Sequence, residues 1–112
     1  MTKAHILDYL SIHKSEFKEK YGVEEIGLFG SYAKDEAKED SDIDIFVNMQ
    51  ATFDNVMHLK FNLEESLHKK VDLITKHKHM KPFLFEMITK DIIYVWEDTH
   101  GVIYSWRYRP VY

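Results

Sequence analysis

The chain has 112 residues, a formal net charge of −4 and no cysteine. This length suits a single domain that buries about two-thirds of its unfolded surface without cross-links. The lack of cysteine excludes disulfides and cysteine-bound zinc, and the acidic balance argues against binding a nucleic-acid backbone over the whole surface. The sequence has no apolar run that could span a bilayer and no signal-peptide core, so we expect a cytoplasmic protein without direct membrane or nucleic-acid contacts.

Segments with helix and strand patterns alternate along the chain. In order they are residues 2–20 (helix), 25–29 (strand), 31–39 (short helix and loop), 42–47 (strand), 54–69 (helix), 71–75 (strand), 82–90 (helix) and 92–96 (a strand or the tail of the preceding helix). Ile6, Leu10 and Phe17 form one stripe of the first helix, and Gly22 is a candidate C-cap. The alternation predicts an α/β or α+β fold, with one sheet and helices against it.

Three aspartates stand at predicted strands beside apolar residues. Asp42 and Asp44 are two apart, and strand side chains two apart project from the same face. Asp72, in the strand 71–75, would join them if the two strands were neighbours. Such carboxylates raise each other's pKa unless a cation lies between them, and their hard oxygens suit Mg²⁺. The alternative is a pair of ordinary solvated charges on an exposed face, which a D-x-D pattern alone would favour.

Gly30-Ser31 closes one predicted strand and opens a predicted helix. Glycine permits a tight turn and a close backbone approach, and the N–H groups at a helix start suit a phosphate oxygen. The alternative is an ordinary strand-to-helix turn with Ser31 as the N-cap. Together, an anion cradle and metal-binding carboxylates are what the transfer of a nucleotidyl group from a nucleoside triphosphate requires.

This combination resembles a known family. Gly30-Ser31, ten intervening residues and Asp42-Ile43-Asp44 resemble the G-S-x10-D-x-D signature of the DNA polymerase β-like nucleotidyltransferase superfamily. With FGSYAKDEAKEDSDIDIFV and KVDLIT, residues 1–97 resemble a minimal nucleotidyltransferase (MNT) domain, and residues 98–112 form a tail beyond the resemblance. The resemblance implies the polymerase β-like palm fold, a small mixed sheet flanked by helices.

The resemblance also implies the chemistry of the site. Asp42 and Asp44 would bind two Mg²⁺ ions, and Asp72 would bind the catalytic metal and help to activate the incoming hydroxyl. Gly30 and Ser31 would hold the triphosphate of ATP.

One segment departs from the family pattern. Where the family often has A-R-G-E, this chain has Ala33-Lys34-Asp35-Glu36. Lys34 keeps a positive charge for the nucleotide but lacks the fork geometry of arginine. Asp35 replaces a glycine, so we expect a different local turn and a weaker hold on the triphosphate.

Small members of this family typically act as antitoxins that attach AMP to a tyrosine of a partner HEPN RNase toxin. The resemblance therefore predicts an ATP-dependent adenylyltransferase in a hetero-oligomeric complex with a HEPN toxin. Two alternatives stay open: an antitoxin that only covers the toxin, and a nucleotidyltransferase that acts on a small molecule.

Two further features have several interpretations. The tail alternates aromatic residues with arginine, which suits a partner-docking segment, a base-stacking segment, an edge strand of the same domain or a frayed end. His68, His77 and His79 could suggest zinc, but a fourth ligand is lacking and a solvated basic turn is favoured.

Overall fold

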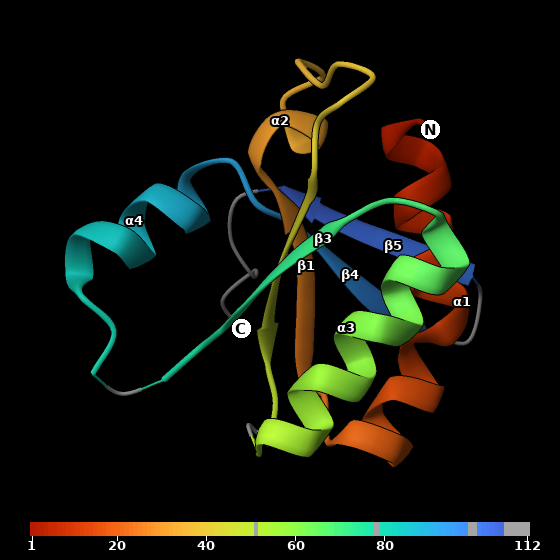
Figure 1. Ribbon diagram of the computed structural model, residues 1–112, viewed down its shortest axis with the longest axis vertical. Helices are drawn as coiled ribbons and strands as arrows, with labels where there is room; N and C mark the ends of the chain where they lie inside the picture. The colour runs from red at the N-terminus through yellow and green to blue at the C-terminus, as the bar shows by residue number, and fades with distance from the viewer. Residues whose placement is uncertain (51, 78, 99–100, 107–112) are drawn as a thin grey trace.

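The computed structural model describes residues 1–50, 52–77, 79–98 and 101–106, from residue 96 onward by the backbone alone. Its helices and strands alternate as the sequence predicts as far as β4, which a fifth strand follows directly (Figure 1). In chain order they are α1 (Lys3–Tyr21), β1 (Glu25–Phe29), α2 (Gly30–Ala33), β2 (Ile43–Asn48), α3 (Phe53–Leu67), β3 (Val71–Thr75), α4 (Pro82–Lys90), β4 (Ile93–Asp98) and β5 (Gly101–Trp106). None of the described helices is long and apolar enough to cross a membrane.

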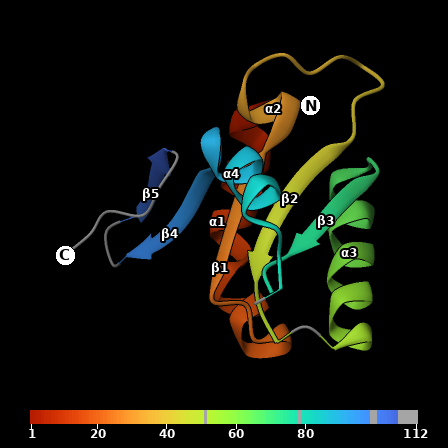
Figure 2. The same cartoon turned by 90° about the vertical axis from the view of Figure 1, so that its left-hand side faces the viewer.

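The strands form one five-stranded sheet in the order β3-β2-β1-β4-β5. β2 and β3 run parallel, and the other neighbouring pairs are antiparallel. Helices α1 and α3 lie on one side of this sheet and α4 lies on the other (Figures 1 and 2). The predicted mixed sheet flanked by helices is confirmed.

Local signals explain the ends of α1. The side chain of Thr2 accepts a hydrogen bond of 3.1 Å from the backbone N–H of His5, which satisfies one free donor of the first turn. Gly22 ends the helix with a φ of +68°, the left-handed conformation that glycine adopts without strain. Between these caps the stripe residues Ile6, Leu10 and Phe17 are fully buried, as predicted.

The sheet separates two hydrophobic clusters. Alternate residues of β2 point to opposite faces, so that Ile45 and Val47 join the larger cluster with α1 and α3. Phe46 joins Ile88 of α4 and Ile92 in a smaller cluster on the other face. Asp44, two residues before Phe46, therefore projects from the α4 face of the sheet.

The start of the aromatic tail is an edge strand of the same sheet. β5 pairs antiparallel with β4 from Ile93↔Trp106 to Asp98↔Gly101. Of the interpretations of the tail, this pairing agrees with the edge strand. The arginines of the tail, Arg107 and Arg109, lie outside the described residues. The docking and base-stacking interpretations depend on these residues and stay predictions.

Candidate active site

Two neighbouring strands bring the predicted acids together. In the parallel pairing of β2 and β3, Asp44 lies directly opposite Asp72. Asp42 is the exposed residue just before β2 and, two residues from Asp44, it projects to the same side. The sequence did not show whether these two strands are neighbours. Their pairing brings the three carboxylates to one end of the β2–β3 pair.

The surroundings of Asp44 disfavour the charged form of its carboxyl group. Burial raises the pKa of the Asp44 carboxyl group from its ordinary 3.8 to about 6, and the charges of Asp72 and then Asp42 add to this increase. Asp42 and Asp72 are exposed, whereas Asp44 is partly buried. The repulsion among the three carboxylates is what a bound cation would relieve.

The donor chemistry of this site fits Mg²⁺. Asp42, Asp44 and Asp72 offer carboxylate oxygens only, and Mg²⁺ is usually held by one or two carboxylates together with waters and substrate phosphates. Within the described ranges, no group of three His, Cys, Asp or Glu side chains is arranged to hold a metal ion. Any Mg²⁺ held by these acids would therefore need further ligands from water and substrate phosphates.

Gly30 packs directly against this edge. Its φ is +73°, and a Cβ atom at this position would overlap the carboxylate of Asp44. Only glycine meets both conditions, because other residues resist this φ and add the clashing atom. Helix α2 begins at Gly30 and its N-cap position is Phe29, so the interpretation of Ser31 as the N-cap is wrong. Ser31 instead lies, partly exposed, in the first turn.

The turn after α2 has a backbone shape that favours glycine. Asp35, at the position where the family often has glycine, has a φ of +59°. Its carboxylate forms an ion pair of 2.8 Å with the Lys3 ammonium group. Lys34, the neighbouring residue, is exposed and lies 4.0 Å from Glu36 in a weak ion pair. Its ammonium group is therefore available to a phosphate.

Two substitutions at Asp35 separate the effect of backbone shape from that of the ion pair. Asp35→Gly relieves the left-handed strain and loses an exposed ion pair, so we expect its stability to stay within about 1 kcal/mol of the original. Asp35→Val forces a β-branched residue into the same φ, and we expect a loss of about 1–2 kcal/mol. Urea unfolding measures both, with Lys3→Ala as the control for the ion pair alone. Equal stability of the valine and glycine variants would contradict this account.

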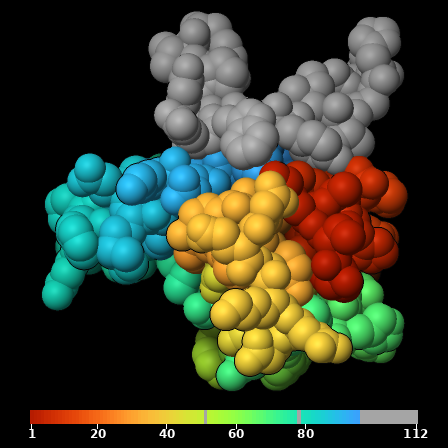
Figure 3. All heavy atoms as spheres, turned by 90° about the horizontal axis from the view of Figure 1, so that it is seen from above, coloured from red at the N-terminus to blue at the C-terminus, as the bar shows by residue number. Residues whose placement is uncertain are grey.

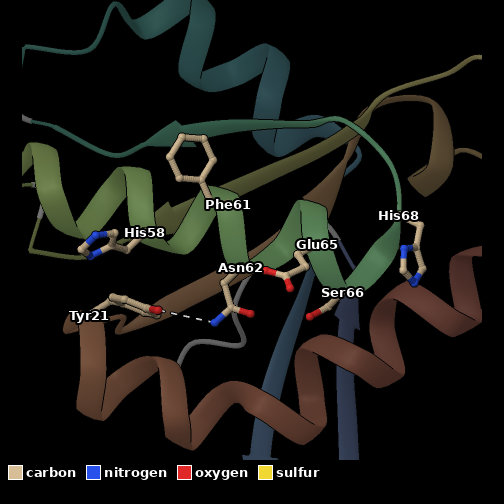
Figure 4. Close-up of a pocket in the computed structure, with 7 residues that line it drawn as sticks. All are labelled: Tyr21, His58, Phe61, Asn62, Glu65, Ser66 and His68. Atoms are coloured by element: carbon tan, nitrogen blue, oxygen red, sulfur yellow. Dashed lines mark hydrogen bonds between the residues drawn. The ribbon is translucent and has the colours of Figure 1, made fainter.

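A wide hollow of the surface lies elsewhere. It is an open groove between the end of α1 and the outer side of α3, lined by Tyr21, His58, Phe61, Asn62, Glu65, Ser66 and His68 (Figure 4). The side chain of Asn62 donates a hydrogen bond of 3.4 Å to the Tyr21 hydroxyl across it. The groove lies on the α1 and α3 side of the sheet, whereas Asp44 projects from the other side. His77 and His79 are exposed and do not join His68 in any cluster suited to a metal among the described residues.

A smaller pocket adjoins the acids. It lies between α2 and α4 and is lined by Phe29, Gly30, Lys34, Leu84, Met87, Ile88 and Asp91. In the space-filling view of Figure 3, the cyan atoms of α4 border the orange atoms around α2. No pattern in the sequence predicted that the α4 residues of this pocket are functional.

The sequence of this site matches a known family. The model of the family "Polymerase beta, Nucleotidyltransferase" matches residues 13–99, which include the glycine, the serine and all three acids. The chain belongs to this nucleotidyltransferase family. It is 38% identical over 97 residues to the protein adenylyltransferase MntA of Thermococcus cleftensis, covering 85% of this chain and 97% of MntA. It is 44% identical over 98 residues to MJ1379 of Methanocaldococcus jannaschii, covering 84% of this chain and 98% of the relative.

Solved structures support the same fold. A minimal nucleotidyltransferase superimposes with a TM-score of 0.70 at 28% identity, covering 83% of this chain and 95% of the other. A chain of a toxin–antitoxin complex crystallised with AMP-PNP gives a TM-score of 0.62 at 22% identity, covering 80% and 74%. A complex of a tri-AMPylated Shewanella oneidensis HEPN toxin with its MNT antitoxin gives 0.59 at 20% identity, covering 81% and 69%. The nucleotidyltransferase thus has the fold of minimal family members.

Proposed function

We propose that this nucleotidyltransferase is an antitoxin that transfers AMP from Mg-ATP to a tyrosine hydroxyl of a partner HEPN RNase toxin and thereby neutralises it. The observation that carries the proposal is the pairing of Asp44 with Asp72, with Gly30 packed against Asp44. The relatives support the choice of reaction, since one is named a protein adenylyltransferase and a structural neighbour is an antitoxin bound to an AMPylated HEPN toxin.

The reaction joins an acceptor oxygen to the α-phosphorus of ATP. The new O–P bond forms as the bond from the α-phosphorus to the bridging oxygen breaks, and pyrophosphate leaves. In this proposal Asp72, which is exposed and lies opposite Asp44, takes the proton of the attacking hydroxyl. Mg²⁺ held by Asp42, Asp44 and Asp72 would supply positive charge for the reacting phosphate oxygens.

The opposite wall of the site binds the triphosphate. The backbone at Gly30 and the hydroxyl of Ser31 lie at the start of α2, next to Asp44. Lys34 lies at the end of that helix and contributes a mobile point charge without the two-point geometry of arginine. Attached AMP would add negative charge and bulk to the toxin where an RNA phosphate has to bind, which accounts for neutralisation.

Intact-mass spectrometry tests this function. A HEPN-domain protein encoded beside this chain is incubated with the nucleotidyltransferase, MgCl₂ and ATP. We expect a gain of one or more AMP units, none with the double variant Asp42→Asn/Asp44→Asn, and an unchanged gain with Asp40→Asn, an exposed aspartate of the same loop. A stable complex in which the toxin has lost its RNase activity without any gain in mass would overturn the enzymatic proposal. It would favour an antitoxin that acts by binding alone.

A further inference from the structure

The pocket between α2 and α4 shares residues with the proposed triphosphate site. Gly30 lines this pocket and also touches the carboxylate of Asp44, and Lys34 lines the same wall. A group seated in the pocket therefore lies next to the phosphates that Gly30 and Lys34 would hold. Because a nucleoside links its base to the α-phosphate through one sugar, the base of a bound nucleotide is within reach of this pocket.

The size of the pocket suits one ring system. Its volume is about 220 Å³, below the roughly 300–1,000 Å³ of pockets that enclose whole drug-sized ligands. Ile88 forms the buried part of the pocket, with 3% of its surface exposed. Leu84 and Met87 flank it with 42% and 58% exposed, so the walls present apolar surface to water. A flat ring would cover these side chains, and the thioether of methionine packs well against aromatic rings.

The acidic residue of the pocket suits an amino group. Asp91 follows the last turn of α4 and lines the pocket together with Met87 and Ile88. An ionised carboxylate only accepts hydrogen bonds, so it favours a base edge with an exocyclic amino group and disfavours one with a carbonyl. Adenine carries such an amino group, whereas hypoxanthine carries a carbonyl at the same place.

We propose that this pocket is the seat of the nucleobase, with Leu84, Met87 and Ile88 as its apolar walls and Asp91 as the residue that selects an amino-bearing base. The inference rests on the proposed function, because it assigns a part of the same nucleotide. The acceptor protein is the other possible occupant, and it would also cover Phe83, which is 73% exposed on α4 and does not line the pocket, so that Phe83 separates the two occupants in the test.

The test measures calorimetric dissociation constants of the full chain for ATP, ITP and inorganic tripolyphosphate in MgCl₂. We expect Met87→Ala to weaken ATP binding about tenfold and to leave tripolyphosphate, which has no base, unchanged. We expect Asp91→Asn to bring the ATP and ITP constants together. Phe83→Ala, on the same helix outside the pocket, is the matched control and should change none of the three, and thermal unfolding confirms that each variant is folded.

Each outcome has a distinct meaning. The proposal that the base binds in this pocket is overturned if Met87→Ala weakens the binding of ATP and of tripolyphosphate equally. It is also overturned if this substitution has no effect on either. Loss of toxin binding in both Phe83→Ala and Met87→Ala, with ATP binding intact, overturns it in favour of a protein docking face. If the unaltered protein binds ATP and transfers AMP while Met87→Ala is neutral, only this inference fails. If the unaltered protein binds no nucleotide, the proposed function fails with it.

Discussion

Replacing Asp44 with asparagine is expected to abolish AMP transfer and, in the absence of metal, to stabilise the folded protein at pH 8. The loss of transfer should be at least about a thousandfold, because a proposed ligand of the metal ion and a charge in the site are removed together. The gain in stability follows from the raised pKa of Asp44, since a charge that burial and two neighbouring carboxylates disfavour is no longer present.

The sign of the pH dependence follows from the same pKa. Asp44 has a pKa of about 6 in the folded chain and an ordinary value of 3.8. Between these values the folded state retains a proton that the unfolded state has lost, so the contribution of Asp44 to stability falls as pH rises through about 4 to 6. Below this window Asp44 is protonated in both states, and the contribution is neutral relative to asparagine. Above this window Asp44 is charged in both states, and the full loss of stability relative to asparagine remains.

Thermal unfolding of the two proteins measures this penalty. Because Asp44 is partly exposed and its charge is screened by solvent, we expect about 1–2 kcal/mol at pH 8, or roughly 5–10 °C in Tm for a domain of this size. The difference from Asp44→Asn should vanish at low pH, and MgCl₂ should raise the Tm of the unaltered protein only. Asp40→Asn serves as the control for a lost surface charge. A less stable Asp44→Asn protein at pH 8 would contradict the electrostatic account.

Gly30→Ala is expected to lower the transfer rate at least about a hundredfold, even at temperatures where the variant is fully folded. The added Cβ would overlap the carboxylate of Asp44, and displacing a catalytic group by about 1 Å can reduce a rate a hundredfold. The same substitution places alanine at a φ of +73°, which should lower stability by about 1–2 kcal/mol.

Gly22→Ala is the matched control for this experiment. Gly22 also has a positive φ, of +68°, but it ends α1, and a Cβ there would meet the side chain of Gln50 at 3.2 Å. We expect a similar loss of stability without a loss of transfer, as measured by initial rates of AMP incorporation. If both variants lost activity in proportion to their stability, the close contact between Gly30 and Asp44 would have no special role.

The sequence predicted the parts of the fold that depend on local signals. The strands 25–29 and 71–75 and the helix 82–90 occur with the predicted bounds. Gly30 follows the first strand, Lys76 follows the second, and Pro82 begins the helix. Helix α2 is shorter than the polar segment 31–39 allowed, since a turn at Lys34 and Asp35 ends it.

Parts of the site could not be predicted because they depend on tertiary contacts. Sequence reasoning could identify Asp42, Asp44 and Asp72 as acids, but only strand order sets Asp72 beside Asp44. The pocket on α4 depends on how a short helix packs against the far side of the sheet. Its exposed leucine and methionine carry no signal in the sequence that separates a ligand wall from ordinary surface.

The order of strands in the sheet also bears on how the protein can be extended. Asp44 and Asp72 belong to β2 and β3, of which β3 forms one edge of the sheet, whereas β5 forms the other edge. With neighbouring strands about 4.8 Å apart, four spacings separate β3 from β5 by roughly 19 Å. A reporter, affinity tag or additional module joined directly after Trp106 would thus attach at the edge of the sheet opposite β3.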